Sequence, residues 1–170
     1  MTLLLLITSF MMNFSVINEP DVSELRDLFY KAAVNKSSSQ KMSKILDKVD
    51  DKSTPILLCY KGVSDMIQAK HVLNPISKLS MFNSGKTLIE EAIKRDPDDL
   101  EMRFLRFSIQ SNLPGFLGYR EDLSSDKLKL VNEIGSLEDE QLKRNIIEYL
   151  SSSKYCTEEE LKKLKKWMKA

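Results

Sequence analysis

Apolar residues recur every three or four positions along nearly the whole chain after residue 20, which is the spacing of one face of an α-helix. The first stripe contains Leu25, Leu28, Phe29 and Ala32, and it follows Asp21, a residue type that caps helix N-termini. No stretch between turn residues alternates convincingly between polar and apolar side chains, so the pattern predicts no sheet. The expected fold is all-α, with seven or eight helices packed as antiparallel neighbours.

Proline and capping residues divide this pattern into separate helices. Residues 54–55 (Thr-Pro) predict a helix start, because proline is favoured at the first helical position. Residues 74–75 (Asn-Pro) are interpreted as the end of that helix, followed by a loop over residues 71–81. Residues 96–99 (Asp-Pro-Asp-Asp) predict a new start, with acids at the positive end of the helix dipole. Further helices are expected from residue 37, over about 80–95, 125–134, 138–150 and 158–169.

Residues 85–97 carry a recognisable packing pattern. Small residues, Gly85 and Ala92, stand twelve and five positions before Pro97, and the bulky Ile89 stands eight before it. Small side chains let a paired helix approach closely, and the bulky one fills the gap between pairs. This pattern resembles the second helix of a tetratricopeptide repeat, and the similarity extends over residues 54–110.

The chain as a whole is also similar to small exported bacterial proteins. The similarity rests on a Tyr-Lys-Gly helix at residues 60–62, an Asp-Pro joint at 96–97 and a Phe-Leu-Gly-Tyr turn at 116–119. Together the two resemblances imply a helical-repeat scaffold with no catalytic activity.

Length and charge narrow the class of protein. The chain has 170 residues, with 26 Lys and Arg against 25 Asp and Glu and a formal net charge of +1. Residues 19–170 are long enough for one domain with its own hydrophobic core. The near-zero net charge gives no global argument for nucleic-acid binding, so no nucleic-acid partner is expected.

The first 18 residues contain no charged side chain, and residues 3–7 and 10–12 are apolar. An apolar run of about ten residues is typical of a secretory signal peptide. We therefore expect export to the periplasm or cell envelope of a bacterium. An uncleaved membrane anchor and an apolar core helix are the alternatives for this segment.

Catalytic and metal chemistry have little support. His71 is the single histidine, and the two cysteines, Cys59 and Cys156, form no C-x-x-C motif, so neither a zinc site nor a cofactor is expected. A Cys59–Cys156 disulfide is possible in an exported protein. Residues 85–87 (Gly-Lys-Thr) lack the glycine that a phosphate-binding loop needs five positions earlier, where Ser80 stands.

The candidate binding residues are long polar side chains on two predicted helices. On the later helix, Arg103 and Arg106 lie three apart, and the next turn adds Gln110 to the same face. In a superhelical array, the preceding first helix would place three further side chains opposite them: Tyr60, Lys61 and Lys70. Guanidinium groups in such a groove would suit an acidic peptide. The alternative is local ion pairing with neighbouring acids, namely Glu101, Glu121 or Asp122.

Two further segments have open interpretations. Residues 114–119 carry large apolar side chains in a turn, which either form a recognition loop or fold back over the helix ends. Residues 161–170 carry five lysines opposite an apolar face; such a helix either caps the array or rests on an anionic membrane. The expected function is therefore non-catalytic binding of a protein or peptide segment, and the alternative is a membrane-associated structural protein.

Overall fold

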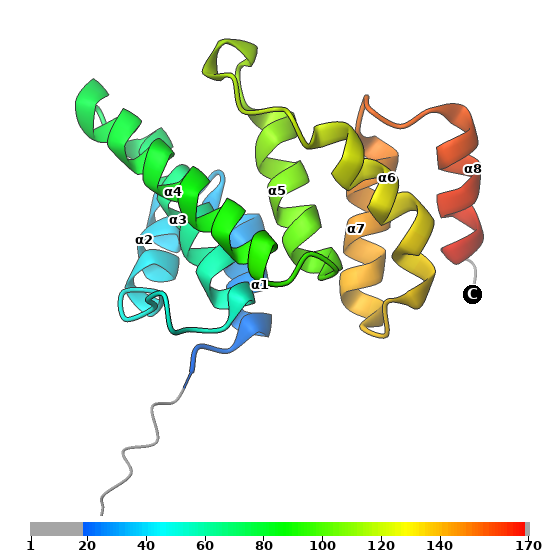
Figure 1. Ribbon diagram of the computed structural model, residues 1–170, viewed down its shortest axis with the longest axis horizontal. Helices are drawn as coiled ribbons and strands as arrows, with labels where there is room; N and C mark the ends of the chain where they lie inside the picture. Colours follow the sequence, from blue (N-terminus) through cyan, green and yellow to red (C-terminus); the bar gives the residue numbers. More distant parts are fainter. Residues whose placement is uncertain (1–18, 169–170) are drawn as a thin grey trace, which may run out of the picture.

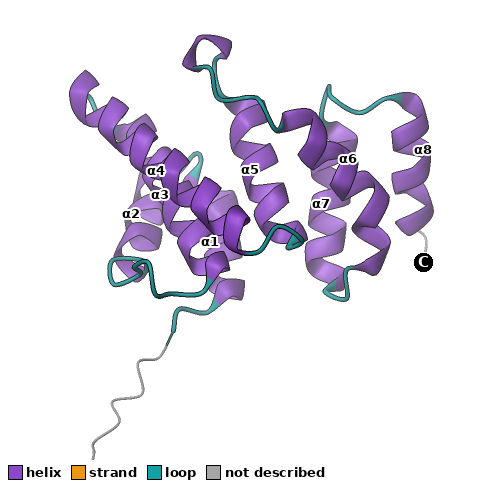
Figure 2. Ribbon diagram, viewed as in Figure 1, coloured by secondary structure: helices purple, strands orange, loops and turns teal. Residues whose placement is uncertain are grey.

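A computed structural model describes residues 19–168, and over that range the protein contains eight α-helices, two short 3-10 turns and no strand (Figures 1 and 2). The expectation of an all-α fold with seven or eight helices is confirmed. The helices are α1 (Val22–Ala32), α2 (Lys36–Ile45), α3 (Pro55–His71), α4 (Pro75–Arg95), α5 (Leu100–Asn112), α6 (Leu123–Glu133), α7 (Glu140–Ser152) and α8 (Glu158–Trp167). The 3-10 turns are η1 (Gly115–Leu117) and η2 (Ile134–Ser136).

The helices form two groups on either side of α5. Figure 1 shows α1 to α4 at one end of the molecule, α6 to α8 at the other, and α5 between them. One cluster of buried apolar side chains includes residues from all eight helices, so the two groups share a core. Burial of such a cluster is the main driving force for folding.

Helices α3 and α4 are in close contact at a pair of glycines. A Cβ atom added to Gly85 would stand 2.5 Å from the carbonyl oxygen of Gly62, and one added to Gly62 would stand 2.6 Å from that of Gly85. Ile89 and Ala92 are fully buried on the same side of α4. The expectation that small residues allow close packing here is therefore confirmed at Gly85. The Gly-Lys-Thr sequence lies inside α4 rather than in a loop.

One predicted boundary is wrong. Residues 74–75 begin α4 instead of introducing a loop over residues 71–81. The Asn74 side chain accepts hydrogen bonds from the backbone N–H groups of Ile76 and Ser77, and Pro75 occupies the first helical position. These are the features of a helix start, and α4 consequently gains a first segment of residues 75–80 that is exposed on every side.

Other helix ends differ from the prediction by a few residues or not at all. Helix α8 begins at residue 158 as predicted, and Thr157 caps it with reciprocal bonds to Glu160. The cap of α5 is Asp99, the last residue of the predicted start at 96–99, because Asp99 accepts the backbone N–H of Met102. The cap of α2 is Asn35, two positions before the predicted Ser37.

The expectations for residues 1–18 lie outside the described part of the chain. Between residues 19 and 168, no helix is both long and apolar enough to cross a membrane. Cys59 is buried and Cys156 half-buried, and both are free thiols.

Candidate functional site

The six side chains expected to line a binding groove are mostly engaged inside the protein. Tyr60 and Gln110 are fully buried, and Arg106 is 3% exposed. The remaining three donate hydrogen bonds to backbone carbonyl oxygens: Lys61 to Val49, Lys70 to Ala33 and Arg103 to Pro97. Burial keeps Tyr60, Gln110 and Arg106 away from an acidic peptide, whereas the exposed Lys70 uses only one of its three ammonium N–H groups in its bond to Ala33.

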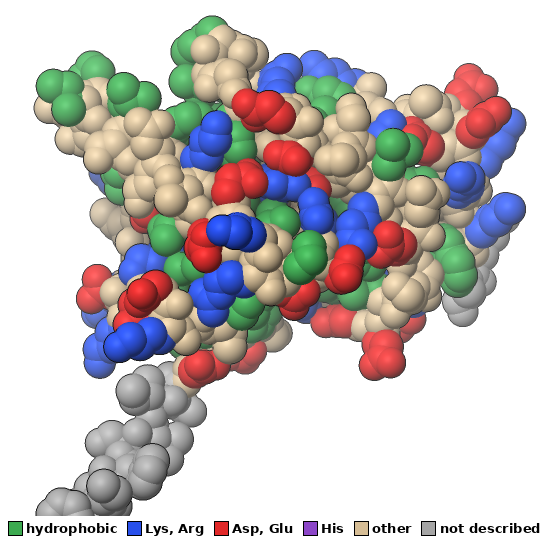
Figure 3. Space-filling model, viewed as in Figure 1, with side chains coloured by type: hydrophobic (Ala, Val, Ile, Leu, Met, Phe, Trp, Pro, Cys, Tyr) green, Lys and Arg blue, Asp and Glu red, His purple; other side chains and the backbone are tan. Residues whose placement is uncertain are grey.

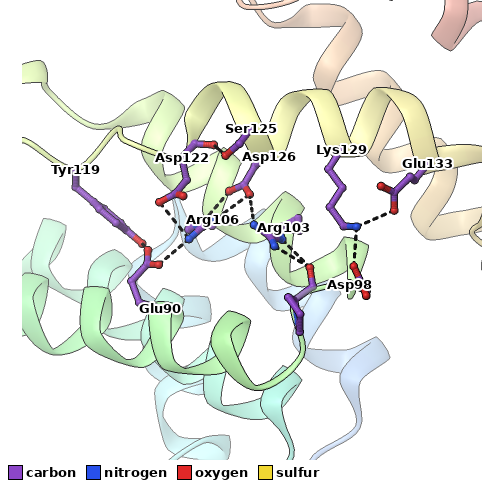
Figure 4. A network of polar contacts seen from close by, with 11 residues as sticks. Glu90, Asp98, Arg103, Arg106, Tyr119, Asp122, Ser125, Asp126, Lys129 and Glu133 are labelled. Atoms are coloured by element: carbon purple, nitrogen blue, oxygen red, sulfur yellow. Dashed lines mark hydrogen bonds and ion pairs between the residues drawn. The ribbon is translucent and has the colours of Figure 1, made fainter.

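Arg103 and Arg106 do converge, but on a carboxylate of α6. Asp126 is fully buried and accepts hydrogen bonds from Arg103 Nη1 at 2.9 Å and from Arg106 Nε and Nη2 at 2.7 and 2.8 Å (Figure 4). Arg106 also contacts Glu90 of α4 at 2.6 Å and Asp122 at 3.2 Å. We call these five residues the Asp126 cluster. It joins α4, α5 and α6, and its Arg106–Asp122 pair is one of the local pairings considered from the sequence.

The electrostatics of the Asp126 cluster favour the charged guanidinium. Burial alone would lower the pKa of Arg106, but the hydrogen bond and charge of Asp126, with Glu90 and Asp122, outweigh it and raise the pKa. Tyr119 extends the network, because its hydroxyl donates to Glu90 at 2.6 Å and burial raises its pKa. A buried cation is stable only when such partners surround it. The cluster therefore serves to hold α4, α5 and α6 together.

Tyr60 belongs to a second network, centred on Glu101 of α5. The Tyr60 hydroxyl donates to Glu101, and Arg26 of α1 binds both carboxylate oxygens at 2.9 Å. Burial, together with the charge of Glu101, raises the pKa of Tyr60, and the hydrogen bond to Glu101 raises that of Arg26. The structure therefore assigns Tyr60 and Arg106 to separate networks. Gln110 belongs to neither: its buried amide has no hydrogen-bond partner among residues 19–168.

An apolar groove opens on another part of the surface. It has a volume of about 920 Å³ and lies between the first segment of α4 and the loop that follows α5. Figure 1 shows both of these segments projecting from the body, and Figure 3 shows apolar side chains at two projections with a notch between them. Its lining comprises Phe29, Tyr30, Ala33, Met66, Ile67, Ala69, Lys70, Pro75, Lys78, Leu79, Phe82, Ser108, Ile109, Asn112, Leu113, Pro114, Phe116, Leu117 and Tyr149.

Large apolar side chains on the two projections face solvent. On the α4 side, Leu73 is 97% exposed, Ile76 81% and Leu79 55%. On the other side, Phe116 is 87% exposed, although Tyr119 of the same loop is buried. The loop is thus anchored to the body at Tyr119, while Phe116 does not fold back over the helix ends. Clustered exposed apolar residues mark interaction surfaces.

The polar groups that line the apolar groove are mostly bonded within the protein. Ser108 Oγ donates to the carbonyl oxygen of Leu105, and Asn112 Nδ2 donates to that of Ser108 and to the Tyr149 hydroxyl. Lys70 donates to Ala33, as described above. The Lys78 side chain makes no hydrogen bond or ion pair with the described residues. The groove therefore offers contact area and positive charge but few free hydrogen-bonding groups.

Sequence reasoning singled out Lys70 and the loop of residues 114–119, but it missed the first segment of α4 and the groove that lies between this segment and the loop. The available signal was the Asn-Pro pair at residues 74–75 interpreted as a helix start, which places Ile76 and Leu79 on the first turns of a helix. Phe116 is a large apolar residue in a predicted turn. Such a turn is also typical of a loop that packs over the helix ends, so the sequence does not indicate whether Phe116 is exposed.

His71 is the last residue of α3, and its buried Nε2 has no partner among residues 19–168. No group of three or more His, Cys, Asp or Glu side chains in this range is arranged to hold a metal ion.

Comparison of the chain with protein-family models, with curated proteins and with solved structures finds no match.

Proposed function

We propose that the protein is a non-catalytic module that binds a segment of another protein in the bacterial cell envelope, with the apolar groove as its docking surface. The observation that carries this proposal is the combination of the groove with the exposed apolar residues beside it. Leu73 and Ile76 lie outside the lining of the groove, yet they are among the most exposed apolar side chains of residues 19–168.

This arrangement favours a macromolecule over a small ligand. The groove volume lies within the range of about 300–1,000 Å³ that small-molecule sites occupy. A ligand confined to the groove would nevertheless leave Leu73 and Ile76 in water. A protein segment that continues past the first turns of α4 would cover them and gain about 25 cal/mol for each Å² of apolar surface removed from water.

Site-specific photocrosslinking in the host cell tests this proposal. A photoreactive phenylalanine analogue is placed at Phe116 or Ile76, and at Leu128 of α6 as the control, because Leu128 is 48% exposed and lies outside the groove. We expect protein adducts from the first two positions and none from Leu128. Equal adducts from all three positions, or no protein adduct from any, would contradict the proposal.

The proposed location is tested by the intact mass of the protein recovered from cell fractions. We expect a mass lacking about 15 to 20 N-terminal residues, in an envelope or secreted fraction, because that is the length of a signal peptide. A full-length mass in the cytoplasmic fraction would refute export. A full-length mass in the membrane fraction would favour the anchored alternative.

A second candidate function is contact with an anionic membrane through α8. Trp167 is 44% exposed and Met168 51% exposed, beside four exposed lysines of the same helix: Lys162, Lys163, Lys165 and Lys166. Cations beside exposed apolar side chains are typical of interfacial helices. Co-sedimentation with phosphatidylglycerol vesicles tests it: binding lost in Lys162→Glu with Lys166→Glu would support this candidate, and protein that stays in solution would eliminate it.

A further inference from the structure

The occupant of the apolar groove must bring a backbone that is already hydrogen-bonded. An extended peptide would bury N–H and C=O groups against apolar side chains, and each unpaired buried group is costly. The lining groups Ser108, Asn112 and Lys70 already donate to partners inside the protein. An α-helix satisfies its own backbone and presents only side chains to the groove. Pairing with a sheet edge is not an option either, because residues 19–168 form no strand.

The charges at the groove are all positive. Lys70 and Lys78 line it, and no Asp or Glu of the described residues does. Lys78 stands on the exposed first segment of α4 and makes no ion pair with the described residues. A partner with carboxylates beside its apolar face would meet these ammonium groups, whereas a basic partner would be repelled.

The same charges argue against a second copy of the chain as the occupant. If the first segment of α4 from one molecule entered the groove of another, it would bring Lys78 towards the partner's Lys70 and Lys78. Like charges across an interface disfavour a complex. Residues 1–18 have no acidic side chain, so they do not match the groove either.

We propose that the apolar groove recognises an amphipathic α-helix of another protein, with an apolar face that fills the groove and acidic residues along its flank. This inference rests on the proposed function and specifies the chemical class of its partner. Leu79 and Phe116 are exposed apolar side chains that line opposite sides of the groove, and they would pack against the two sides of that helix.

Fluorescence anisotropy with labelled peptides tests the chemistry of the partner, using the full chain. The peptides are about 18 residues long and share leucines at positions i, i+3, i+4 and i+7, with flanks of Glu, Gln or Lys. A fourth peptide carries the Glu flanks and two central prolines, which break the helix. We expect the Glu-flanked peptide to bind roughly tenfold more tightly than the Lys-flanked one in low salt, with a smaller ratio at higher ionic strength.

Two substitutions at the groove separate the sources of affinity. Lys78→Glu should remove or invert the preference for Glu flanks, and Lys165→Glu on α8 is its matched control, because that lysine is exposed and distant from the groove. Phe116→Asp should weaken binding of every helical peptide at least tenfold, whereas Leu128→Asp should not. Both groove positions are exposed, so unchanged melting temperatures are expected.

The outcomes distinguish this inference from the proposed function. Binding that is lost in Phe116→Asp but shows no flank preference, or no loss with the proline peptide, overturns the acidic-helix inference and keeps the groove as a docking surface. No peptide binding, or binding insensitive to Phe116→Asp, overturns both. A concentration-dependent dimer in sedimentation that Phe116→Asp abolishes makes a second copy the occupant, and that also overturns the inference.

Discussion

Replacing Gly85 by alanine is the sharpest test of the contact between α3 and α4. The added Cβ would stand 2.5 Å from the carbonyl oxygen of Gly62, about 0.9 Å closer than the 3.4 Å at which ordinary contact begins. A backbone oxygen cannot rotate away, so the two helices must separate. Overpacking of this kind costs up to about 3 kcal/mol, and alanine returns about 1 kcal/mol of helix propensity. We expect a net loss of about 2 kcal/mol in the free energy of unfolding.

Thermal and urea unfolding measure this loss. For a domain of this size, about 2 kcal/mol corresponds to a fall of roughly 4–8 °C in melting temperature. The control is Gly115→Ala in η1, where the nearest atom to the added Cβ is 3.9 Å away and a small gain in stability is expected. If Gly85→Ala were as stable as the control, α3 and α4 would not be in backbone contact at this point, and the packing argument would be wrong.

Three further predictions concern an ion network, a pH effect and a helix cap. Asp126→Ala should lower the free energy of unfolding by about 3 kcal/mol, because it leaves two guanidinium groups without their shared buried partner; an equal loss from the exposed control Asp47→Ala would contradict this. The bond from Lys127 and the cap of α8 lower the pKa of Glu160 below its ordinary 4.5 despite burial, so the stability from this charge is present above about pH 4.5 and is lost as the pH falls through the folded-state pKa. Glu160→Gln should therefore destabilise by about 1 kcal/mol at pH 7 and by less as the pH is lowered below 4.5 in urea titrations, and a constant difference would disprove the linkage. Asn74→Ala removes the cap of α4 and should cost about 1 kcal/mol and weaken peptide binding; unchanged affinity would mean that the first segment of α4 takes no part in docking.

The all-α fold could be predicted because apolar spacing reflects the geometry of each helix separately. Leu25, Leu28, Phe29 and Ala32 are all buried on α1, as their spacing predicted. Helix ends are harder to predict from sequence than the helices themselves, because an Asn-Pro pair is compatible with the end of one helix and with the start of the next. At residues 74–75 the two interpretations differ only in the conformation of the next few residues, and the side-chain bonds of Asn74 decide between them.

The candidate site was less predictable, because it depends on contacts between distant residues. The sequence correctly placed Arg103 and Arg106 on one face of α5, but periodicity does not say whether a polar face meets water or another helix. Their main partner, Asp126, lies some 20 residues further along the chain and is buried only because α6 packs there. Likewise, the exposure of Phe116 depends on how its loop leaves α5.

The Asp126 cluster also bears on how the molecule unfolds. Proteins open locally as well as globally, and a group of helices at one end of a molecule can open while the rest stays folded. Detaching α6 from α5 would strip Asp126 of three charge-assisted hydrogen bonds and leave Arg106 without its buried partner. Separation of α5 from α6 therefore has a high free-energy cost. Amide hydrogens on α5 and α6 should consequently exchange together, at rates set by global unfolding.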